Sequence, residues 1–240
     1  MRLHHALVSA PFAAVALACS GSPAAHPATA GDSAAATPAA AAPAPTAANA
    51  DSDRSVGGSG VPTGFVGRTD DSGTSITGVK YTPAAAGTWD VRTGPAHILY
   101  SPSATGHGHY TAQAEIDQVE APHHPEAYGV FIGGQSLDGA AQKYAYFLVR
   151  GDGKYAIKIR DGADARTVVP FTASPNVPKA DASGKASYAL RVQITGDRAR
   201  FFVNDQAVAT VPTADMPTVG IAGLRINHNL HVVVTPVVGK

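Results

Sequence analysis

Lys154-Tyr155-Ala156-Ile157-Lys158-Ile159-Arg160 is the stretch of sequence that decides the fold. Its large apolar side chains recur at every second position, and basic side chains fall between them. Because successive side chains of a strand point to opposite faces, this alternation predicts a β-strand with one buried face. The preceding run 144–150 is equally rich in β-forming residues, and Gly151-Asp152-Gly153 between the two runs tolerates positive φ. We therefore predict a β-hairpin.

The same pattern extends in both directions from this hairpin. Gly196-Asp197 and Asn204-Asp205 are typical tight-turn dipeptides between short apolar runs. No long segment carries the apolar stripe of a helix. Further strands are expected at 88–92, 96–100, 110–120, 188–195, 198–203, 206–211, 220–227 and 231–238. About ten short strands at close spacing predict an all-β, two-sheet antiparallel sandwich.

Several of these runs resemble the concanavalin A-like lectin/glucanase (laminin-G-like) superfamily. The resemblance is carried by Tyr128-Gly-Val-Phe-Ile-Gly-Gly134, by 144–155, by Phe202-Val-Asn-Asp-Gln-Ala-Val208 and by Val219-Gly-Ile-Ala-Gly-Leu-Arg225. It covers most of residues 85–240 and implies a jelly-roll sandwich. The superfamily contains lectins, laminin-G-like modules, glycosidases and keto-glycoside hydrolases, so the implied fold does not select a function.

The first residues have the features of an export signal. Met1-Arg2-Leu3 carries a positive charge, and an apolar run from residue 6 to residue 18 is too short to span a bilayer. The run ends at Cys19, the only cysteine of the chain, in a segment that resembles a bacterial lipobox. The segment departs from the usual pattern because Ala16 stands where Leu is commonest and Leu17 comes one place late. The resemblance implies lipidation of Cys19; an ordinary signal peptide is the alternative.

The predicted domain organisation follows from these boundaries. Residues 1–18 are expected to be a lipoprotein signal peptide, and 19–60 a lipidated cysteine with an Ala/Pro-rich tether that has too little apolar mass to fold. Residues 61–240 are expected to form the β-sandwich domain. The chain is then exported and anchored in the bacterial cell envelope, at the outer membrane or cell surface.

The composition limits the classes of molecule that the protein is expected to bind. Charged residues make up 15% of the chain and the formal net charge is +0, so no overall field draws it to nucleic acid. We expect no nucleic-acid binding. The expected partners are a carbohydrate or an envelope protein, and a membrane through the lipid anchor alone.

One acidic strand raises an enzymatic possibility. Glu115, Asp117 and Glu120 match the Glu-x-Asp-x-x-Glu pattern of laminarinase-like retaining β-glucanases. By resemblance, Glu115 is the nucleophile, Glu120 the general acid/base and Asp117 the residue that tunes them. A one-residue bulge is needed to return Glu120 to the face of the other two. The alternative is an ordinary half-buried strand, because Trp89 is the only tryptophan and no Trp-rich sugar cleft is indicated.

A polar ligand site is predicted instead where tyrosines and basic residues gather on the central strands. Its members are Tyr128, Tyr144, Tyr146, Arg150, Lys158 and Arg160. Tyrosines on a sheet can stack on sugars, although packing within the sheet is their commoner role.

No metal site and no cofactor are predicted. His107 and His109 lie in a Gly-rich turn, and His123-His124 lies between two prolines, where local hydrogen bonding is the commoner role. Calcium accompanies some lectin-like sandwiches, but the acidic residues show no spacing that demands it.

Three functions follow from these observations. The favoured one is a non-catalytic, lectin-like surface module that recognises a glycan or a protein. The alternatives are a retaining β-glucan hydrolase that uses Glu115 and Glu120, and a keto-glycoside hydrolase or related lyase of the same fold.

Overall fold

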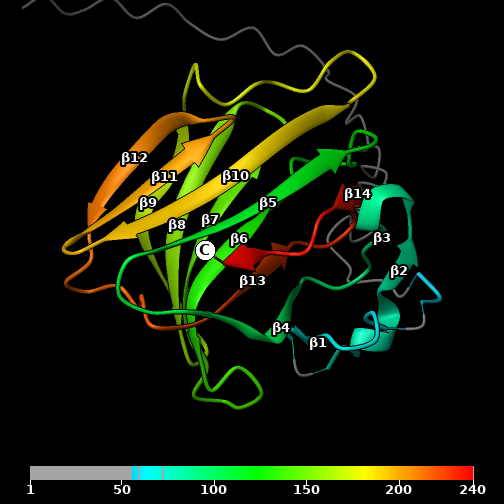
Figure 1. Ribbon diagram of the computed structural model, residues 1–240. Helices are drawn as coiled ribbons and strands as arrows, with labels where there is room; N and C mark the ends of the chain where they lie inside the picture. The colour runs from blue at the N-terminus through cyan, green and yellow to red at the C-terminus, as the bar shows by residue number, and fades with distance from the viewer. Residues whose placement is uncertain (1–55, 59, 72, 240) are drawn as a thin grey trace, which may run out of the picture. The chain divides into compact units, whose positions relative to one another are not determined.

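The computed structural model describes residues 56–58, 60–71 and 73–239, and their regular secondary structure is almost entirely β-strand (Figure 1). Two single-turn 3-10 helices, Ile76–Gly78 and Ala85–Gly87, are the exceptions. The strands are β1 Val66–Thr69, β2 Lys80–Pro83, β3 Trp89–Arg92, β4 His97–Gly106, β5 Tyr110–Gln118, β6 Ala127–Gln135, β7 Lys143–Arg150, β8 Lys154–Asp161, β9 Asp164–Ala173, β10 Ala186–Thr195, β11 Arg198–Val203, β12 Gln206–Pro212, β13 Gly220–Ile226, β14 His231–Val234 and β15 Val238–Gly239.

These strands form two antiparallel sheets, which confirms the predicted sandwich. Sheet A has the order β12-β11-β10-β5-β14-β3-β2, and β15 also pairs with β5. Sheet B has the order β1-β4-β13-β6-β7-β8-β9. The sheets lie one behind the other in Figure 1. Strand β13 is placed between β4 and β6, so a late segment of the chain joins two early ones.

The main hydrophobic core lies between the sheets. Alternation along β5 buries Ala112, Ala114 and Ile116 and leaves Glu115 exposed. Phe147 of sheet B meets Phe201 of sheet A, with ring centroids 5.3 Å apart. We call the faces that meet here the inner faces. Burying side chains of this size stabilises the sandwich by about 1.5–3 kcal/mol each.

A second hydrophobic cluster lies on the outer face of sheet B. Strands β6 and β7 are buried along nearly their whole length on both faces, because this second cluster covers the outer one. It consists of Ile98, Tyr100, Ala127, Phe131, Leu137, Tyr144, Tyr146 and Leu148. This cluster forms the floor of the candidate site.

The expected strands are present, with differences at the edges. The hairpin of β7 and β8 turns at Gly153, whose φ is +83°. The predicted strand 231–238 is interrupted between β14 and β15, where Thr235 exchanges hydrogen bonds with Glu115 through its backbone and hydroxyl. Strands β1, β2 and β9 were not predicted. The predicted signal peptide, Cys19 and most of the tether lie outside the described residues. Within the described part of the chain, no helix is long and apolar enough to cross a membrane.

Candidate functional site

Five of the six residues predicted to bind a ligand share the outer face of sheet B. In the β7–β8 register Tyr144 lies opposite Arg160 and Tyr146 lies opposite Lys158, and Arg150 lies on the same face at the end of β7. Alternation within each strand therefore correctly predicted that these five side chains share one face.

Tyr128 is the exception, because the prediction that it lies in the same surface site is wrong. It lies opposite Val149 and is buried in the inner core, where its hydroxyl donates to Gln118 Oε1 over 3.1 Å. The register between β6 and β7 places it on the opposite face from Tyr144 and Tyr146, so it is not part of a surface site.

The two tyrosines on the outer face are packed rather than displayed. Tyr144 is 1% exposed and Tyr146 is 7% exposed, and the rings lie 5.5 Å apart beside Phe131. Burial raises the pKa of Tyr144 to about 12 and also raises the pKa of Tyr146. Their rings therefore have no free face for stacking on a sugar, and both hydroxyls stay protonated over the physiological range.

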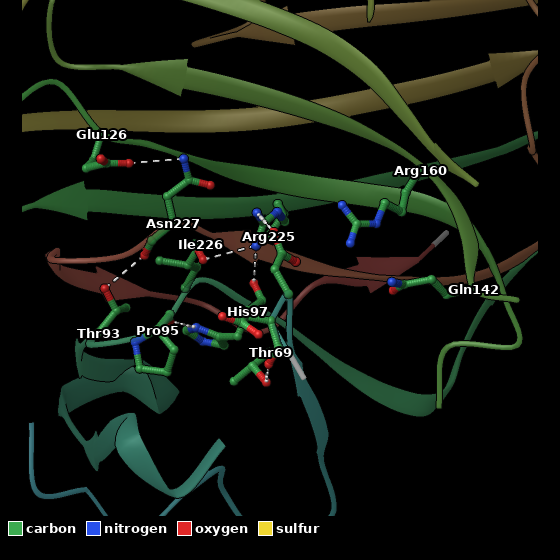
Figure 2. Close-up of polar contacts among 12 residues, drawn as sticks. Thr69, Thr93, Pro95, His97, Glu126, Gln142, Arg160, Arg225, Ile226 and Asn227 are labelled. Atoms are coloured by element: carbon green, nitrogen blue, oxygen red, sulfur yellow. Dashed lines mark hydrogen bonds and ion pairs between the residues drawn. The ribbon is translucent and has the colours of Figure 1, made fainter. Parts of the chain in front are cut away.

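Arg225 is the central charged residue of this face, and sequence analysis did not select it. Only 6% of Arg225 is exposed, and its guanidinium lies 6.0 Å from the Tyr146 ring centroid. It donates to the carbonyl of His97 over 3.1 Å and forms an ion pair with Asp70 (Figure 2). A buried guanidinium needs such partners, because desolvation of an unpaired charge is costly.

Two guanidinium nitrogens on this face lack a partner. Nε of Arg225 and Nη1 of Arg68 are buried and form no hydrogen bond with any described residue. Both arginines lie opposite Ile98 in β4, Arg68 from β1 and Arg225 from β13, so they flank one point of the sheet. Because buried donors are nearly always paired with an acceptor, these two nitrogens are exceptions among the described residues.

Further cations border the aromatic floor. Arg150 pairs with Asp152 and lies 4.3 Å from the Phe171 ring centroid, where Lys158 also approaches. Arg160 and Arg225 both act electrostatically on Tyr144. We name this surface the arginine face; it comprises Arg68, Asp70, Tyr144, Tyr146, Arg150, Lys158, Arg160 and Arg225.

The predicted catalytic acids lie on the other sheet. Glu115 and Asp117 project from the outer face of β5, whose pairing with β10 continues without a bulge from Tyr110 to Gln118. Glu120 follows the end of the strand and faces Arg92, at 3.6 Å, and His231 Nδ1, at 3.5 Å. The bulge that would align Glu120 with Glu115 is absent from β5.

Glu115 nevertheless lines a hollow of about 480 Å³ on the outer face of sheet A. Ala189, opposite Glu115 in β10, leaves room for it because its side chain is a single methyl group. On one side, Arg191 is held between the Phe202 ring, 3.8 Å away, and Asp205, 3.2 Å away. The hollow thus offers a carboxylate and a fixed guanidinium.

Besides the arginine face and the hollow around Glu115, the structure contains a cluster of polar side chains that was not predicted. His124, Glu126 and His228 place three potential metal-ligand atoms within 4.8 Å of one another. His124 and Glu126 are two residues apart in sequence, and the pairing of β6 with β13 brings the distant His228 to them.

Comparison with known proteins shows the fold. No protein-family model and no curated protein sequence matches the chain. Its structure is similar to carbohydrate-binding module CBM66 from Bacillus subtilis, with a TM-score of 0.53, 16% sequence identity, and coverage of 74% of this chain and 96% of that one. The match confirms the predicted fold, an all-β jelly-roll sandwich of two antiparallel sheets.

Two further solved structures resemble the chain more loosely. One is a protein with a galectin-like fold from Bacillus subtilis, with a TM-score of 0.49, 10% identity, and coverage of 67% and 86% of the two chains. The other is a beta-1,3-glucanase from Mycobacterium marinum, with a TM-score of 0.44, 15% identity, and coverage of 79% and 97%.

Proposed function

We propose that this protein is a non-catalytic module that binds a glycan on the arginine face. The observation that carries the proposal is the pair of buried guanidinium nitrogens without partners, Arg225 Nε and Arg68 Nη1. Glycans are rich in oxygen acceptors, and bidentate recognition of oxygen pairs is a task for which guanidinium groups are suited.

The charges of the arginine face favour an acidic sugar. Asp70 pairs with Arg225 and Asp152 with Arg150. Among the described residues, no carboxylate pairs with Arg68, Lys158 or Arg160, so positive charge is in excess here although the whole chain is neutral. A uronate or other carboxylated sugar would supply both the oxygens and the compensating charge.

The arginines are also fixed before a ligand arrives. Asp70 and the His97 carbonyl hold Arg225, and the Gly162 carbonyl accepts from Arg160 Nε over 3.0 Å. Groups that are already ordered lose little conformational entropy on binding, which raises affinity. Because the tyrosine rings are buried, binding on this face relies on hydrogen bonds and charge rather than on stacking.

The test is a glycan-binding measurement with matched variants. Full-length protein is screened against neutral and uronate-containing oligosaccharides, and hits are quantified by titration calorimetry. We expect Arg160→Gln to weaken binding about tenfold or more, the loss of about 1.4 kcal/mol that one charge-assisted hydrogen bond supplies. The control is Arg200→Gln, which removes an exposed arginine from sheet A. Binding that is unaffected by Arg160→Gln, or absent for every glycan, refutes the proposal.

The hollow around Glu115 supports glycan hydrolysis as the second candidate. Its specific observation is the cavity of about 480 Å³ that Glu115 and Arg191 line. The two candidates use opposite sheets, so variants separate them. If Glu115→Gln abolishes cleavage of a β-glucan while Arg160→Gln has no effect, the protein is a hydrolase. If no β-glucan is cleaved and only Arg160→Gln weakens binding, it is a binding module. The keto-glycoside hydrolase alternative gains no separate support.

We also propose that the module is attached to the bacterial cell envelope through lipidated Cys19. The lipobox-like segment around Cys19 and the Ala/Pro-rich stretch after it support this location. More than one acyl chain on a single cysteine gives stable anchoring, which one chain alone does not.

A further inference from the structure

The pairing of two strands creates a histidine–glutamate–histidine cluster at one end of sheet B. Glu126 directly precedes β6, and His228 follows β13 by two residues. Ile226 pairs with Tyr128, and the Asn227 amide bonds to the Ala127 carbonyl over 3.0 Å. Continuing this register places His228 opposite Glu126. His124 reaches the same point from the loop before β6.

The ligand atoms of these side chains converge on one oxygen. His124 Nδ1 lies 2.8 Å and His228 Nε2 lies 2.9 Å from Glu126 Oε1. A metal ion about 2.1 Å from each atom in tetrahedral geometry would hold them about 3.4 Å apart. The two distances from Glu126 Oε1 therefore need to lengthen by only about half an ångström, and the two imidazole nitrogens, which lie within 4.8 Å of each other, must reach the same separation. Rotation of two partly exposed imidazoles permits both changes.

The carboxylate is buried and held in place. The side chain of Glu126 is 8% exposed, whereas those of His124 and His228 are 26% and 23% exposed. Asn227 Nδ2 donates to the other oxygen, Oε2, over 3.1 Å (Figure 2). An outer hydrogen bond of this kind orients a ligating carboxylate and strengthens metal binding.

A cavity adjoins the cluster. His124 and Glu126 are among the residues that line a cavity of about 320 Å³ between the loop before β6 and the loop around Asp181. An ion held by the three side chains would therefore lie beside an open cavity. This is the arrangement in which a fourth coordination position is taken by water or by an oxygen of a ligand.

We propose that His124, Glu126 and His228 form a binding site for a divalent transition-metal ion, with Zn²⁺ the preferred ion. Two imidazoles and one carboxylate are a ligand set for Zn²⁺ and for the ions that share its geometry. Ca²⁺ and Mg²⁺ prefer six or more oxygen ligands and are not expected to bind. The site is separate from the arginine face and requires no glycan.

The test is direct metal titration of the full-length chain. Each protein carries Cys19→Ser, so that no thiolate competes for metal, and is treated with a chelator before dialysis. We expect one Zn²⁺ per chain by calorimetry, and visible absorption bands of four- or five-coordinate Co²⁺ when cobalt replaces zinc. We expect His124→Ala and His228→Ala each to weaken Zn²⁺ binding at least tenfold and to remove the cobalt bands.

Controls separate this site from other histidines and from misfolding. The double variant His107→Ala/His109→Ala removes two exposed histidines elsewhere on the surface and should leave zinc affinity unchanged. Far-UV circular dichroism of each metal-free variant checks that the sandwich is intact. Zinc should also raise the melting temperature of the parent but not of the His124→Ala protein. The proposal is overturned if folded parent protein binds no stoichiometric zinc, or if the His107/His109 variant loses binding while His124→Ala retains it.

Discussion

Arg225 of β13 and Asp70, directly after β1, form an ion pair although 155 residues separate them in sequence. The pair spans β4, which lies between β1 and β13 in sheet B. Asp70 supplies the charge that makes a buried guanidinium tolerable on the arginine face. The same contact therefore serves both the stability of sheet B and the orientation of the proposed site.

Asp70→Asn should destabilise the fold by about 2–3 kcal/mol. Removing one partner of a buried pair costs about 3–5 kcal/mol, and the partial exposure of Asp70 reduces that figure. Urea denaturation measures the change. The matched control is Asp161→Asn, which breaks the exposed pair with Lys143 and should cost less than about 1 kcal/mol. Equal losses in the two variants would contradict the role assigned to Asp70.

Stability should fall as the pH decreases from about 6.5 to about 4. His97 is fully buried, with Nε2 2.6 Å from the Tyr81 hydroxyl, and its desolvation lowers the pKa to about 4. Between the two pKa values the unfolded chain binds a proton that the folded chain does not, so stability rises with pH across this window. Over the whole window the contribution is on the order of 3 kcal/mol.

His97→Gln should remove this part of the pH dependence while keeping a polar partner for Tyr81. The free energy of unfolding of the parent and the variant is compared at several pH values across the same window. The difference between them should shrink as the pH falls. A constant difference would show that His97 is protonated equally in the folded and unfolded states.

Gln118→Leu should lower the free energy of unfolding by about 1–3 kcal/mol, because two buried groups lose their hydrogen-bond partner. Gln118 is 3% exposed, accepts from the Tyr128 hydroxyl and donates to the Gly184 carbonyl. The leucine leaves both buried groups unsatisfied. Adding Tyr128→Phe should restore part of the loss, because the orphaned hydroxyl is removed with it. Denaturation of the two single variants and the double variant tests this coupling; strict additivity would show that the two side chains do not act together.

Cys19→Ser should release the protein from membranes. If Cys19 carries the lipid, the parent expressed in a bacterial host sediments with the membrane fraction and incorporates labelled fatty acid, and the variant does neither. Ser20→Ala leaves the cysteine in place and should behave as the parent does. Release of both proteins into the soluble fraction would favour the ordinary signal peptide.

The central strands could be predicted because the two features that determine them, side-chain alternation and a turn sequence, are both local in the chain. The alternation in Lys154–Asp161 and the turn at Gly153 mark β8 and its hairpin without reference to the rest of the chain. Strand β9 has no such signal, because Asp164–Ala173 is an edge strand with most side chains exposed on both faces and a proline within it. The position of β9 depends on its pairing with β8, and the residue pattern alone does not predict that pairing.

The candidate sites show the same division. The alternation of side chains along each strand correctly predicted that Tyr144, Tyr146 and Arg160 share one face. It contains no information on the register between β6 and β7, so Tyr128 was assigned to the wrong face. The position of Arg225 in the site depends on the pairing of β13 with both β4 and β6, and no local sequence motif predicts that pairing.

The order β4-β13-β6 imposes a sequence of events on folding. While the protein is being synthesised, the edges of β4 and β6 are exposed for more than 80 residues of elongation before β13 emerges to occupy the position between them. Such long-range closure makes folding slow, and sheet B is completed only near the end of translation. A chain whose synthesis stops before β13 therefore lacks the strand that joins the two halves of sheet B.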